Sequence, residues 1–170
     1  RRAFAGVEHV IHAAALKQID AMEFNPLEAV RTNIGGTENV IEAALDTGVE
    51  RALLVSTDKA EAPTTLYGAT KLCAERIFIA SNKYAGSRKG VFSVMRLGNI
   101  AFSRASVIPK WKALIAAGET SVPVTDPECT RYWISAGEAA KCVLDTLSLP
   151  HGSYTALMSA FRVGDLAEAL

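Results

Sequence analysis

Short apolar runs alternate with patterns of helical period along most of this chain, and this alternation restricts the possible folds more than any other feature. We expect strands over residues 7–13, 52–56 and 92–97, and helices over residues 26–46, 66–84 and 106–117. A regular succession of strand and helix builds a parallel sheet with helices on both faces. The sequence therefore predicts an α/β fold with a doubly wound parallel sheet, arranged as a three-layer sandwich.

The pattern changes in the later part of the chain. A short polar segment over 119–131 precedes an expected helix near 136–148, a short strand at 153–156 and a last amphipathic stretch that ends at Leu170. We therefore divide the chain into residues 1–104, which form the sheet domain, and residues 105–170, a mixed segment.

Composition excludes several classes of function. The 170 residues include 18 basic and 18 acidic side chains, and 49% are hydrophobic, enough for one substantial core. Zero net charge without a basic cluster argues against nucleic acid as a partner. No apolar stretch approaches the roughly 20 residues that span a bilayer, and no signal peptide pattern opens the chain, so we expect a cytoplasmic protein without a membrane partner. Cys73, Cys129 and Cys142 show no metal-ligand spacing, so we expect reduced thiols and no metal site.

The strand at 52–56 leads into a group of polar residues. Ser56, Thr57, Asp58 and Lys59 follow an apolar, β-branched run. This is typical of a buried parallel strand whose carboxyl end carries polar groups, and open α/β sheets bind ligands at that edge. We therefore expect the chemistry of this chain there.

Tyr67 and Lys71 lie four residues apart at the start of an expected helix, so both side chains project from one face. An ammonium beside a phenol lowers the pKa of the phenol, which makes Tyr67 a candidate proton carrier. The spacing alone also fits a packed tyrosine ring and a solvated lysine. His12 lies in an apolar strand, where a hydrogen-bonded core histidine is a better interpretation than a catalytic one.

Several segments, taken in order, carry a resemblance to a known family. They are His12 to Lys17, Asn25 to Glu28, Thr32-Asn33, Ser56 to Ala60, Leu66 to Lys71, Arg96 to Ile100, Ser103 to Pro109, Pro123 to Pro127, and Thr130 to Ile134. In this order they resemble the extended short-chain dehydrogenase/reductase superfamily with its Rossmann-like fold. Within it they are similar to the inverting UDP-N-acetylglucosamine 4,6-dehydratases of the polysaccharide biosynthesis family, over nearly the whole chain.

The resemblance implies a nicotinamide cofactor, NADP or NAD with NADP slightly favoured, and a UDP-sugar substrate. Hydride would leave sugar carbon 4 while Tyr67, with Lys71, takes the hydroxyl proton. Lys59 would be the base at carbon 5 and Asp58 the acid that protonates the departing hydroxyl at carbon 6, so that Asp58, Lys59, Tyr67 and Lys71 are the catalytic set. A solvated loop pair is the alternative interpretation of Asp58 and Lys59.

The resemblance also implies binding residues. Those along the cofactor would be Ala13, Ala14, Ala15, Asn33, Ser56, Tyr67, Lys71, Leu97 and Ile100. Those facing the UDP-sugar, with the later segment contributing to the substrate lobe, would be Lys17, Asn99, Ser103, Arg104, Pro109, Thr125 and Arg131. For Asn99 and Arg131 the alternative is hydrogen bonding that ties loops together, and Trp111 and Trp133 are better explained by packing. Helices over 30–45 and 72–79 form the dimer interface in this superfamily, so a homo-oligomer is expected.

The chain departs from the family pattern at four positions. Gln18 stands where the family usually has His, Ala62 where it has Asn, and Phe102 and Ala105 where it has Gly. A residue with a Cβ restricts φ and close backbone approach, so the loop around 102–105 is expected to be reshaped.

A glycine-rich turn between a strand and a helix, which a dinucleotide fold uses to meet the pyrophosphate, is absent from this sequence. We therefore expect a fragment of a longer enzyme, incomplete at its N-terminus and inactive alone. Two other functions stay open. An epimerase or reductase acting on nucleotide sugars would share Tyr67 and Lys71 without needing Asp58 and Lys59. A catalytically silent cofactor-binding module is the alternative from another class.

Overall fold

The computed structural model describes residues 1–85, 90–103 and 106–170, which fold into two compact units. The first unit contains Arg1–Leu97 and Lys141–Ala156, and the second contains Gly98–Ala140 and Leu157–Leu170. The chain therefore leaves the first unit once, returns to complete it, and ends in the second.

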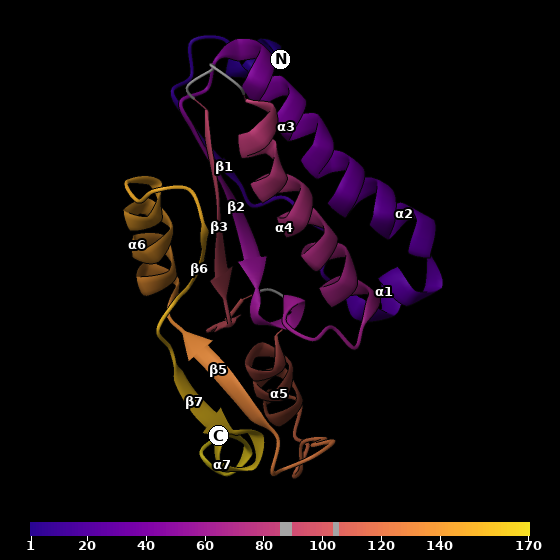
Figure 1. Ribbon diagram of the computed structural model, residues 1–170. Coiled ribbons are helices and arrows are strands. Elements are labelled where there is room, and N and C mark those ends of the chain that lie inside the picture. The colour runs from indigo at the N-terminus through magenta and orange to yellow at the C-terminus, as the bar shows by residue number, and fades with distance from the viewer. Residues whose placement is uncertain (86–89, 104–105) are drawn as a thin grey trace. The chain divides into compact units, whose positions relative to one another are not determined.

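A four-stranded parallel sheet forms the centre of the first unit (Figure 1). Its order is β1-β2-β3-β6, and the strands are β1 (His9–His12), β2 (Arg51–Thr57), β3 (Val91–Leu97) and β6 (Ser153–Thr155). Every neighbouring pair is parallel. The parallel sheet predicted from the strand and helix alternation is confirmed. The strand β6, which the sequence analysis placed in the later segment, pairs with β3 in this unit.

Helices flank this sheet on both sides. They are α1 (Ile19–Phe24), α2 (Pro26–Val30), α3 (Gly36–Thr47), α4 (Leu66–Tyr84) and α6 (Ala136–Leu147), of which residues 141–147 belong to this unit. Three short turns, η1 (Arg2–Phe4), η2 (Arg31–Gly35) and η3 (Asp58–Ala60), complete it. In Figure 1, α3 and α4 lie side by side on one side of the strands and α6 lies on the other.

The main core lies between the sheet and the helices α3 and α4. Alternate strand residues such as Leu54, Phe92 and Val94 point to this side and are almost fully buried. They pack with Ala74 and Phe78 of α4, and the rings of Phe78 and Phe92 meet edge to face at 5.3 Å. This packing holds α4 along the sheet, and the amino-terminal part of the helix reaches the carboxyl end of β2, where Lys71 contacts Val55.

The helix predicted over 26–46 is continuous but not uniform. It runs as α2, then a π-helical turn η2, and then α3, which ends at Gly48 in the left-handed conformation with φ of 74°. Turns of π-helix inside α-helices are often found at functional sites. The π turn places Asn33 on the buried side of the helix, with 2% of its surface exposed.

The second unit contains a smaller mixed sheet. Its order is β4-β5-β7, formed by β4 (Asn99–Ile100), β5 (Thr130–Ile134) and β7 (Ser159–Arg162), with β5 parallel to β4 and antiparallel to β7. The helices α5 (Val107–Ala116) and α7 (Val163–Glu168) accompany it. The sequence predicted α5 but none of these three strands.

Two non-glycine residues among those described have a positive φ: Ala62 at 43° and Phe102 at 58°. Side chains rarely adopt this left-handed region, because Cβ crowds the backbone. Both residues stand at positions where the sequence departs from the family pattern. Across the described residues, no helix combines the length and the apolar character that crossing a bilayer requires.

Candidate active site

The carboxyl end of β2 carries the polar group predicted from the sequence. Ser56 and Thr57 are buried, with 5% and 6% of their surfaces exposed. The chain then turns into η3, where the Thr57 hydroxyl donates to Oδ1 of Asp58 at 3.0 Å and accepts a weak bond from the Lys59 amide at 3.4 Å. The turn therefore holds Asp58 and Lys59 directly beyond the strand.

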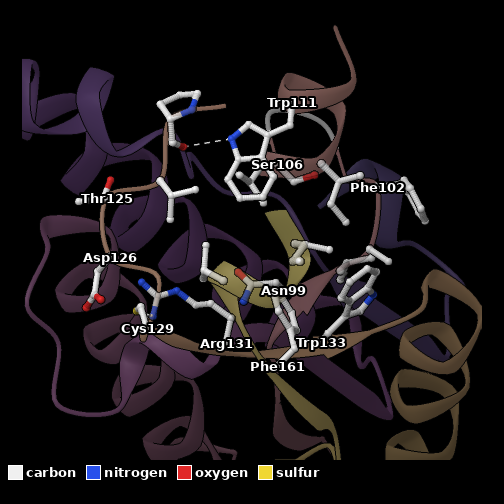
Figure 2. Close-up of a pocket in the computed structure, with 18 residues that line it drawn as sticks. Asn99, Phe102, Ser106, Trp111, Thr125, Asp126, Cys129, Arg131, Trp133 and Phe161 are labelled. Atoms are coloured by element: carbon white, nitrogen blue, oxygen red, sulfur yellow. Dashed lines mark hydrogen bonds between the residues drawn. The ribbon is translucent and has the colours of Figure 1, made fainter. Parts of the chain in front are cut away.

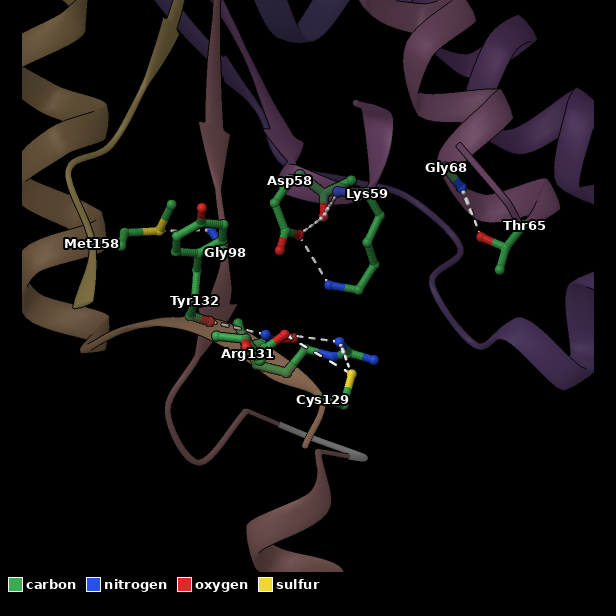
Figure 3. A network of polar contacts seen from close by, with 12 residues as sticks. Asp58, Lys59, Thr65, Gly68, Gly98, Cys129, Arg131, Tyr132 and Met158 are labelled. Atoms are coloured by element: carbon green, nitrogen blue, oxygen red, sulfur yellow. Dashed lines mark hydrogen bonds and ion pairs between the residues drawn. The ribbon is translucent and has the colours of Figure 1, made fainter. Parts of the chain in front are cut away.

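Asp58 and Lys59 form an ion pair within this turn. Nζ of Lys59 lies 3.0 Å from Oδ1 of Asp58 (Figure 3), and their side chains are 35% and 20% exposed respectively. A carboxyl and an amine in direct contact can exchange a proton and remain accessible to a bound molecule. The pair therefore has the two groups that a proton abstraction coupled to a dehydration needs.

The first turn of α4 packs closely against η3. The helix is capped by Thr65, whose hydroxyl accepts from the Gly68 amide at 3.2 Å, as Figure 3 shows. A Cβ at Gly68 would lie 2.2 Å from the carbonyl oxygen of Lys59, which is far inside van der Waals contact. Only glycine allows the helix to come this near, and Tyr67 is brought beside Thr57 and Asp58 as a result.

Tyr67 and Lys71 lie on one face of α4, and both reach the end of β2. Nζ of Lys71 donates to the carbonyl oxygen of Val55 at 2.8 Å, and only 3% of the residue is exposed. Tyr67 interacts with the side chains of Thr57 and Asp58. The structure thus brings together Ser56, Asp58, Lys59, Tyr67 and Lys71, as predicted.

The electrostatics of this pair differ from the sequence prediction. We expected Lys71 to lower the pKa of Tyr67. Instead, burial raises the pKa of the Tyr67 phenol, a hydrogen bond with Thr57 opposes this, and the charge of Asp58 raises it further. Burial also lowers the pKa of Lys71 to about 8, against an opposite effect of Glu75. Loss of hydration on burial is therefore the largest cause of both pKa shifts.

A buried ion pair fixes α4 to β3 one turn beyond Lys71. Nε and one terminal nitrogen of Arg96 donate to the two carboxylate oxygens of Glu75 at 2.9 and 2.7 Å, and Arg96 also pairs with Glu61. The side chain of Glu75 is only 4% exposed. Its hydrogen bonds raise the pKa of Arg96 above its already high ordinary value. The fork geometry of this pair orients the helix that carries Tyr67 and Lys71.

Asn33 connects the loop after β1 to α4. Its amide oxygen accepts from the Leu16 backbone amide at 2.8 Å, and its amide nitrogen donates to the Leu16 carbonyl and to the Thr70 hydroxyl, both at 3.0 Å. Thr70 in turn donates to the carbonyl oxygen of Tyr67. These contacts give Asn33 a positioning role in the structure, whereas the resemblance implied a contact with cofactor.

His12 is a hydrogen-bonded core histidine, as the sequence analysis expected. It is 7% exposed, and its Nε2 lies 3.1 Å from the Thr37 hydroxyl. Burial, and then the charge of Lys71, lower the pKa of His12 to about 4.

The remaining cofactor candidates of the first unit lie near the same strand ends. Ala13 and Ala14 are exposed, Ala15 is half-buried, and all three follow β1, with exposed Lys17 in the same loop. Leu97 is buried at the end of β3. The hydroxyl oxygen of Ser56 is buried and has no hydrogen-bond partner among the described residues. Small side chains on one strand end and an unsatisfied hydroxyl on the next fit a ligand that lies along this edge.

The second unit contains a cavity of about 430 Å³, within the size range of ligand sites (Figure 2). Apolar side chains, both aliphatic and aromatic, make up most of its wall, and polar groups including the Asp126 carboxylate and the Arg131 guanidinium complete it. The lining includes Asn99, Phe102, Thr125, Arg131, Trp133 and Phe161. The cavity lies entirely within this unit.

Four predicted residues line this cavity. Asn99, Thr125 and Arg131 were predicted to face the substrate, and Ile100 to face the cofactor. Asn99 donates to the carbonyl oxygen of Tyr132 at 2.9 Å, and Arg131 donates to that of Thr130 at 2.9 Å. The loop-tying interpretation therefore also applies to Asn99, which joins two distant segments, whereas Arg131 bonds to the residue directly before it.

The other predicted substrate residues of this segment are not seen to line the cavity. Ser103 and Pro109 are not among the described residues that line the cavity, and Arg104 lies outside the described residues. Sequence reasoning missed Phe102, Ser106 and Phe161 as lining residues, and it interpreted Trp133 as packing. Trp111, interpreted in the same way, also lines the cavity, although it is 2% exposed and donates to the carbonyl oxygen of Pro123 at 3.2 Å. Tyr132 and Trp133 are consecutive in the sequence and only Trp133 lines the cavity, so no local aromatic pattern marks this wall.

Comparison with known proteins identifies the relatives of this chain. Residues 1–170 match the profile of the family described as polysaccharide biosynthesis protein. The chain is 44% identical over 170 residues to an inverting UDP-N-acetylglucosamine 4,6-dehydratase of Campylobacter jejuni subsp. jejuni serotype O:23/36 (strain 81-176), with 99% of this chain and 51% of the relative covered.

Solved structures with a similar fold cover nearly the whole chain. Pen from Bacillus thuringiensis is 35% identical with a TM-score of 0.93, over 98% of this chain and 52% of that one. DesIV, a dTDP-glucose 4,6-dehydratase from Streptomyces venezuelae solved with NAD and TYD, is 20% identical with a TM-score of 0.87, over 99% and 57% of the two chains. At that identity the likeness shows the fold alone. The chain spans about half the length of the curated relatives it matches.

Proposed function

Because the chain belongs to the polysaccharide biosynthesis protein family, we propose that the protein is an NAD(P)-dependent nucleotide-sugar 4,6-dehydratase that acts on UDP-N-acetylglucosamine and inverts carbon 5. The observation that carries the proposal is the Asp58–Lys59 ion pair, held beside Tyr67 and Lys71 at the end of β2. A hydride-transfer enzyme needs only the tyrosine and lysine. The additional acid and base are what an elimination requires.

The first unit fits a nicotinamide dinucleotide along its strand ends. Ala13 to Ala15 allow close approach of a ligand, and the unsatisfied Ser56 hydroxyl offers it a hydrogen bond. When bound, such a cofactor supplies reversible hydride transfer at carbons 4 and 6 of the sugar. We propose NADP or NAD, with NADP slightly favoured by the resemblance.

The residues of this chain would move the protons. As Tyr67 accepts the proton of the sugar hydroxyl at carbon 4, its own phenol proton would pass to the neutral amine of Lys71, whose pKa is lowered by burial to about 8. Lys59 takes the proton from carbon 5, which the neighbouring ketone makes acidic. Asp58 protonates the hydroxyl of carbon 6, which leaves as water, and delivery of a different proton to carbon 5 on the opposite face would produce inversion.

The second unit would bind the UDP part of the substrate. Its cavity combines an apolar wall with Asn99, Thr125 and Arg131, and a guanidinium suits contact with a phosphate. We also propose that the protein works as a cytoplasmic homo-oligomer, as the superfamily resemblance implies.

The test is incubation of the full-length protein with UDP-N-acetylglucosamine and cofactor, followed by mass spectrometry of the product. We expect a product that has lost one water. A product of unchanged mass would favour an epimerase, and an unaltered substrate in the presence of bound cofactor would favour a silent binding module.

Two variants separate the steps of the reaction. Lys59→Ala should slow elimination by about 10²–10⁴-fold, the usual contribution of a positioned base, while the first oxidation still proceeds. Reduced nicotinamide should then accumulate in a single turnover, and solvent deuterium should no longer enter carbon 5. Tyr67→Phe should suppress even the first hydride transfer. Lys83→Ala, an exposed lysine on the same helix α4, is the matched control. Dehydration at the parent rate by Lys59→Ala would remove the main support for the proposal.

A further inference from the structure

Arg96 joins two elements that carry the candidate catalytic residues. Its Nε and one terminal nitrogen bind the carboxylate of Glu75 on α4, and its other terminal nitrogen pairs with Glu61, just beyond the turn η3. Arg96 itself belongs to β3, which pairs with a strand on each side within the sheet. A side chain on a central strand therefore ties both α4 and the end of η3 to the sheet.

The two contacts of Arg96 differ in burial. The side chains of Arg96 and Glu75 are 18% and 4% exposed, and their parallel hydrogen bonds fix the plane of the guanidinium. The side chain of Glu61 is 76% exposed, and exposed ion pairs contribute little to stability. A guanidinium that is already fixed loses little entropy when it binds a second carboxylate. The contact therefore restrains Glu61 without being needed to keep the protein folded.

Glu61 closes the turn η3. Its backbone amide donates to the carbonyl oxygen of Asp58 at 3.1 Å. The next residue, Ala62, has a φ of 43°, a left-handed conformation that persists only where surrounding contacts hold it. The start of the turn is held by β2 and by the Thr57 hydroxyl. The pairing of Glu61 with Arg96 holds the other end, directly before the strained residue.

Lys59 lies between these two ends. Its Nζ contacts Oδ1 of Asp58 at 3.0 Å (Figure 3), and its side chain is 35% exposed. Packing covers only part of this side chain, so the position of Nζ depends on the backbone of the turn. A base must lie within hydrogen-bond reach of the proton that it removes. Movement of the turn would therefore affect Lys59 first.

We propose that Glu61 is a positioning residue for Lys59, and that it acts by anchoring the end of η3 to Arg96. The inference rests on the proposed function, because it concerns the elimination step. Glu75 still binds Arg96 when Glu61 is replaced, so α4, with Tyr67, keeps its own anchor. The first hydride transfer should therefore not need Glu61.

The test is a single turnover of the full-length Glu61→Ala variant with UDP-N-acetylglucosamine and oxidised cofactor. Reduced nicotinamide should form at the parent rate and then persist. Elimination should slow by at least about tenfold, because displacing a catalytic group by about 1 Å can cost ~10²-fold. Solvent deuterium should enter carbon 5 more slowly by the same factor. The melting temperature should equal that of the parent, because the lost ion pair is exposed.

Three further variants show whether the effect depends on the contact with Arg96. Glu61→Gln keeps an oxygen acceptor for the guanidinium and should recover most of the elimination rate. In Arg96→Lys, a compact ammonium keeps a charge beside Glu75 but cannot fork to both carboxylates, so adding Glu61→Ala should cause no further loss. Glu50→Ala, at an exposed glutamate directly before β2, is the matched control and should behave as the parent does.

Hydrogen exchange measures the position of the turn without any ligand. In Glu61→Ala, peptides that cover residues 58–62 should exchange their backbone amides faster than in the parent. Peptides from residues 72–84 of α4 should exchange at the parent rate, because Glu75 still holds this helix.

Several outcomes would overturn the inference. They are elimination at the parent rate in Glu61→Ala, an equal slowing of the first hydride transfer, a loss in Glu61→Gln as large as in Glu61→Ala, and unchanged exchange over residues 58–62. If the parent dehydrates its substrate and Glu61→Ala does so equally fast, only the inference fails. If the parent releases no dehydrated sugar, the proposed function fails and the inference fails with it.

Discussion

Buried ionisable side chains are the main feature of this protein at the scale of single residues. His12 and Lys71 are both almost fully buried, and burial is the first cause that lowers the pKa of each. Each also lies near a charge, since Lys71 acts on His12 and Glu75 acts on Lys71. The folded protein therefore favours neutral forms of two bases beside its candidate active site, and its stability must depend on pH.

Acidification should destabilise the protein through His12. The folded pKa of about 4 lies below the ordinary value of 6.5, so between these values the unfolded chain binds a proton that the folded chain does not. The free energy of unfolding should then fall by about 3 kcal/mol as the pH decreases through this window. Urea denaturation at a series of pH values measures this slope. His12→Gln, which can keep a hydrogen bond to Thr37, should flatten it, whereas His9→Gln at an exposed position should not. An unchanged slope in His12→Gln would contradict the burial argument.

For single residues, the sequence predicts positions in the fold well. The position of Tyr67 and Lys71 on one helix face follows from their spacing, and Asp58 and Lys59 follow from the end of an apolar strand. The predicted direction of the pKa shift of Tyr67 was wrong. Burial raises this pKa, and burial depends on how many groups pack around the phenol, which the spacing of two residues does not reveal. Similarly, the positive φ of Phe102 could be suspected from its place in the family pattern, but its contacts with Trp133 and Lys112 could not.

At the scale of helices and strands, the close approach of α4 to the turn η3 depends on one residue. A Cβ at Gly68 would meet the backbone oxygen of Lys59, which cannot rotate away as a flexible side chain could. Gly68→Ala should therefore separate the helix from the turn and displace Tyr67 from Thr57 and Asp58.

The expected cost of Gly68→Ala is about 1–3 kcal/mol of unfolding free energy, as for other overpacked sites, accompanied by loss of activity. Thermal unfolding followed by circular dichroism measures the stability. Gly137→Ala is the matched control, because the added Cβ meets nothing within 4 Å in the helix α6, and the substitution should be neutral or slightly stabilising. Equal stability of the two variants would show that α4 tolerates a wider spacing.

The elements that the sequence predicted well are those with strong local signals. The helix α4 has the predicted bounds, and the strands β2 and β3 differ from the prediction by a residue or two at their ends. The missed strands β4, β5 and β7 are short and carry exposed residues such as Arg131 and Tyr132, so no alternation of apolar and polar side chains marks them. They exist because they pair with one another, and pairing between distant segments is invisible in a local pattern. The helix α1 escaped prediction because it has only six residues.

At the scale of the whole molecule, the absence of a glycine-rich turn in this sequence leads to a binding prediction. In the part of the chain that the structure describes, the strand ends offer Ser56 and the small residues after β1, and the sequence has no glycine-rich turn of the kind that holds a pyrophosphate. The 170-residue chain alone should therefore bind NADP or NAD weakly or not at all, and a longer protein that supplies such a turn should bind it.

Calorimetric titration of each dinucleotide into the chain and into the full-length protein tests this expectation. A dissociation constant in the micromolar range or below for the chain alone would show that the pyrophosphate site has been misplaced. Circular dichroism must first show that the isolated chain is folded, so that a lack of binding is not caused by unfolding.

The first unit is built from two segments that are separated in the sequence, and this affects how it folds during translation. The strand β6 pairs with β3, and Tyr154 lies opposite Met95 only after all of residues 98–140 have been made. A ribosome adds roughly 5–20 residues per second, so β3 waits several seconds for this neighbour. During that interval the edge of β3 that later pairs with β6 is unpaired, and a chaperone could shield it. Closing such a distant contact is slow compared with forming a helix, so we expect β6 to join the sheet as one of the last events in folding.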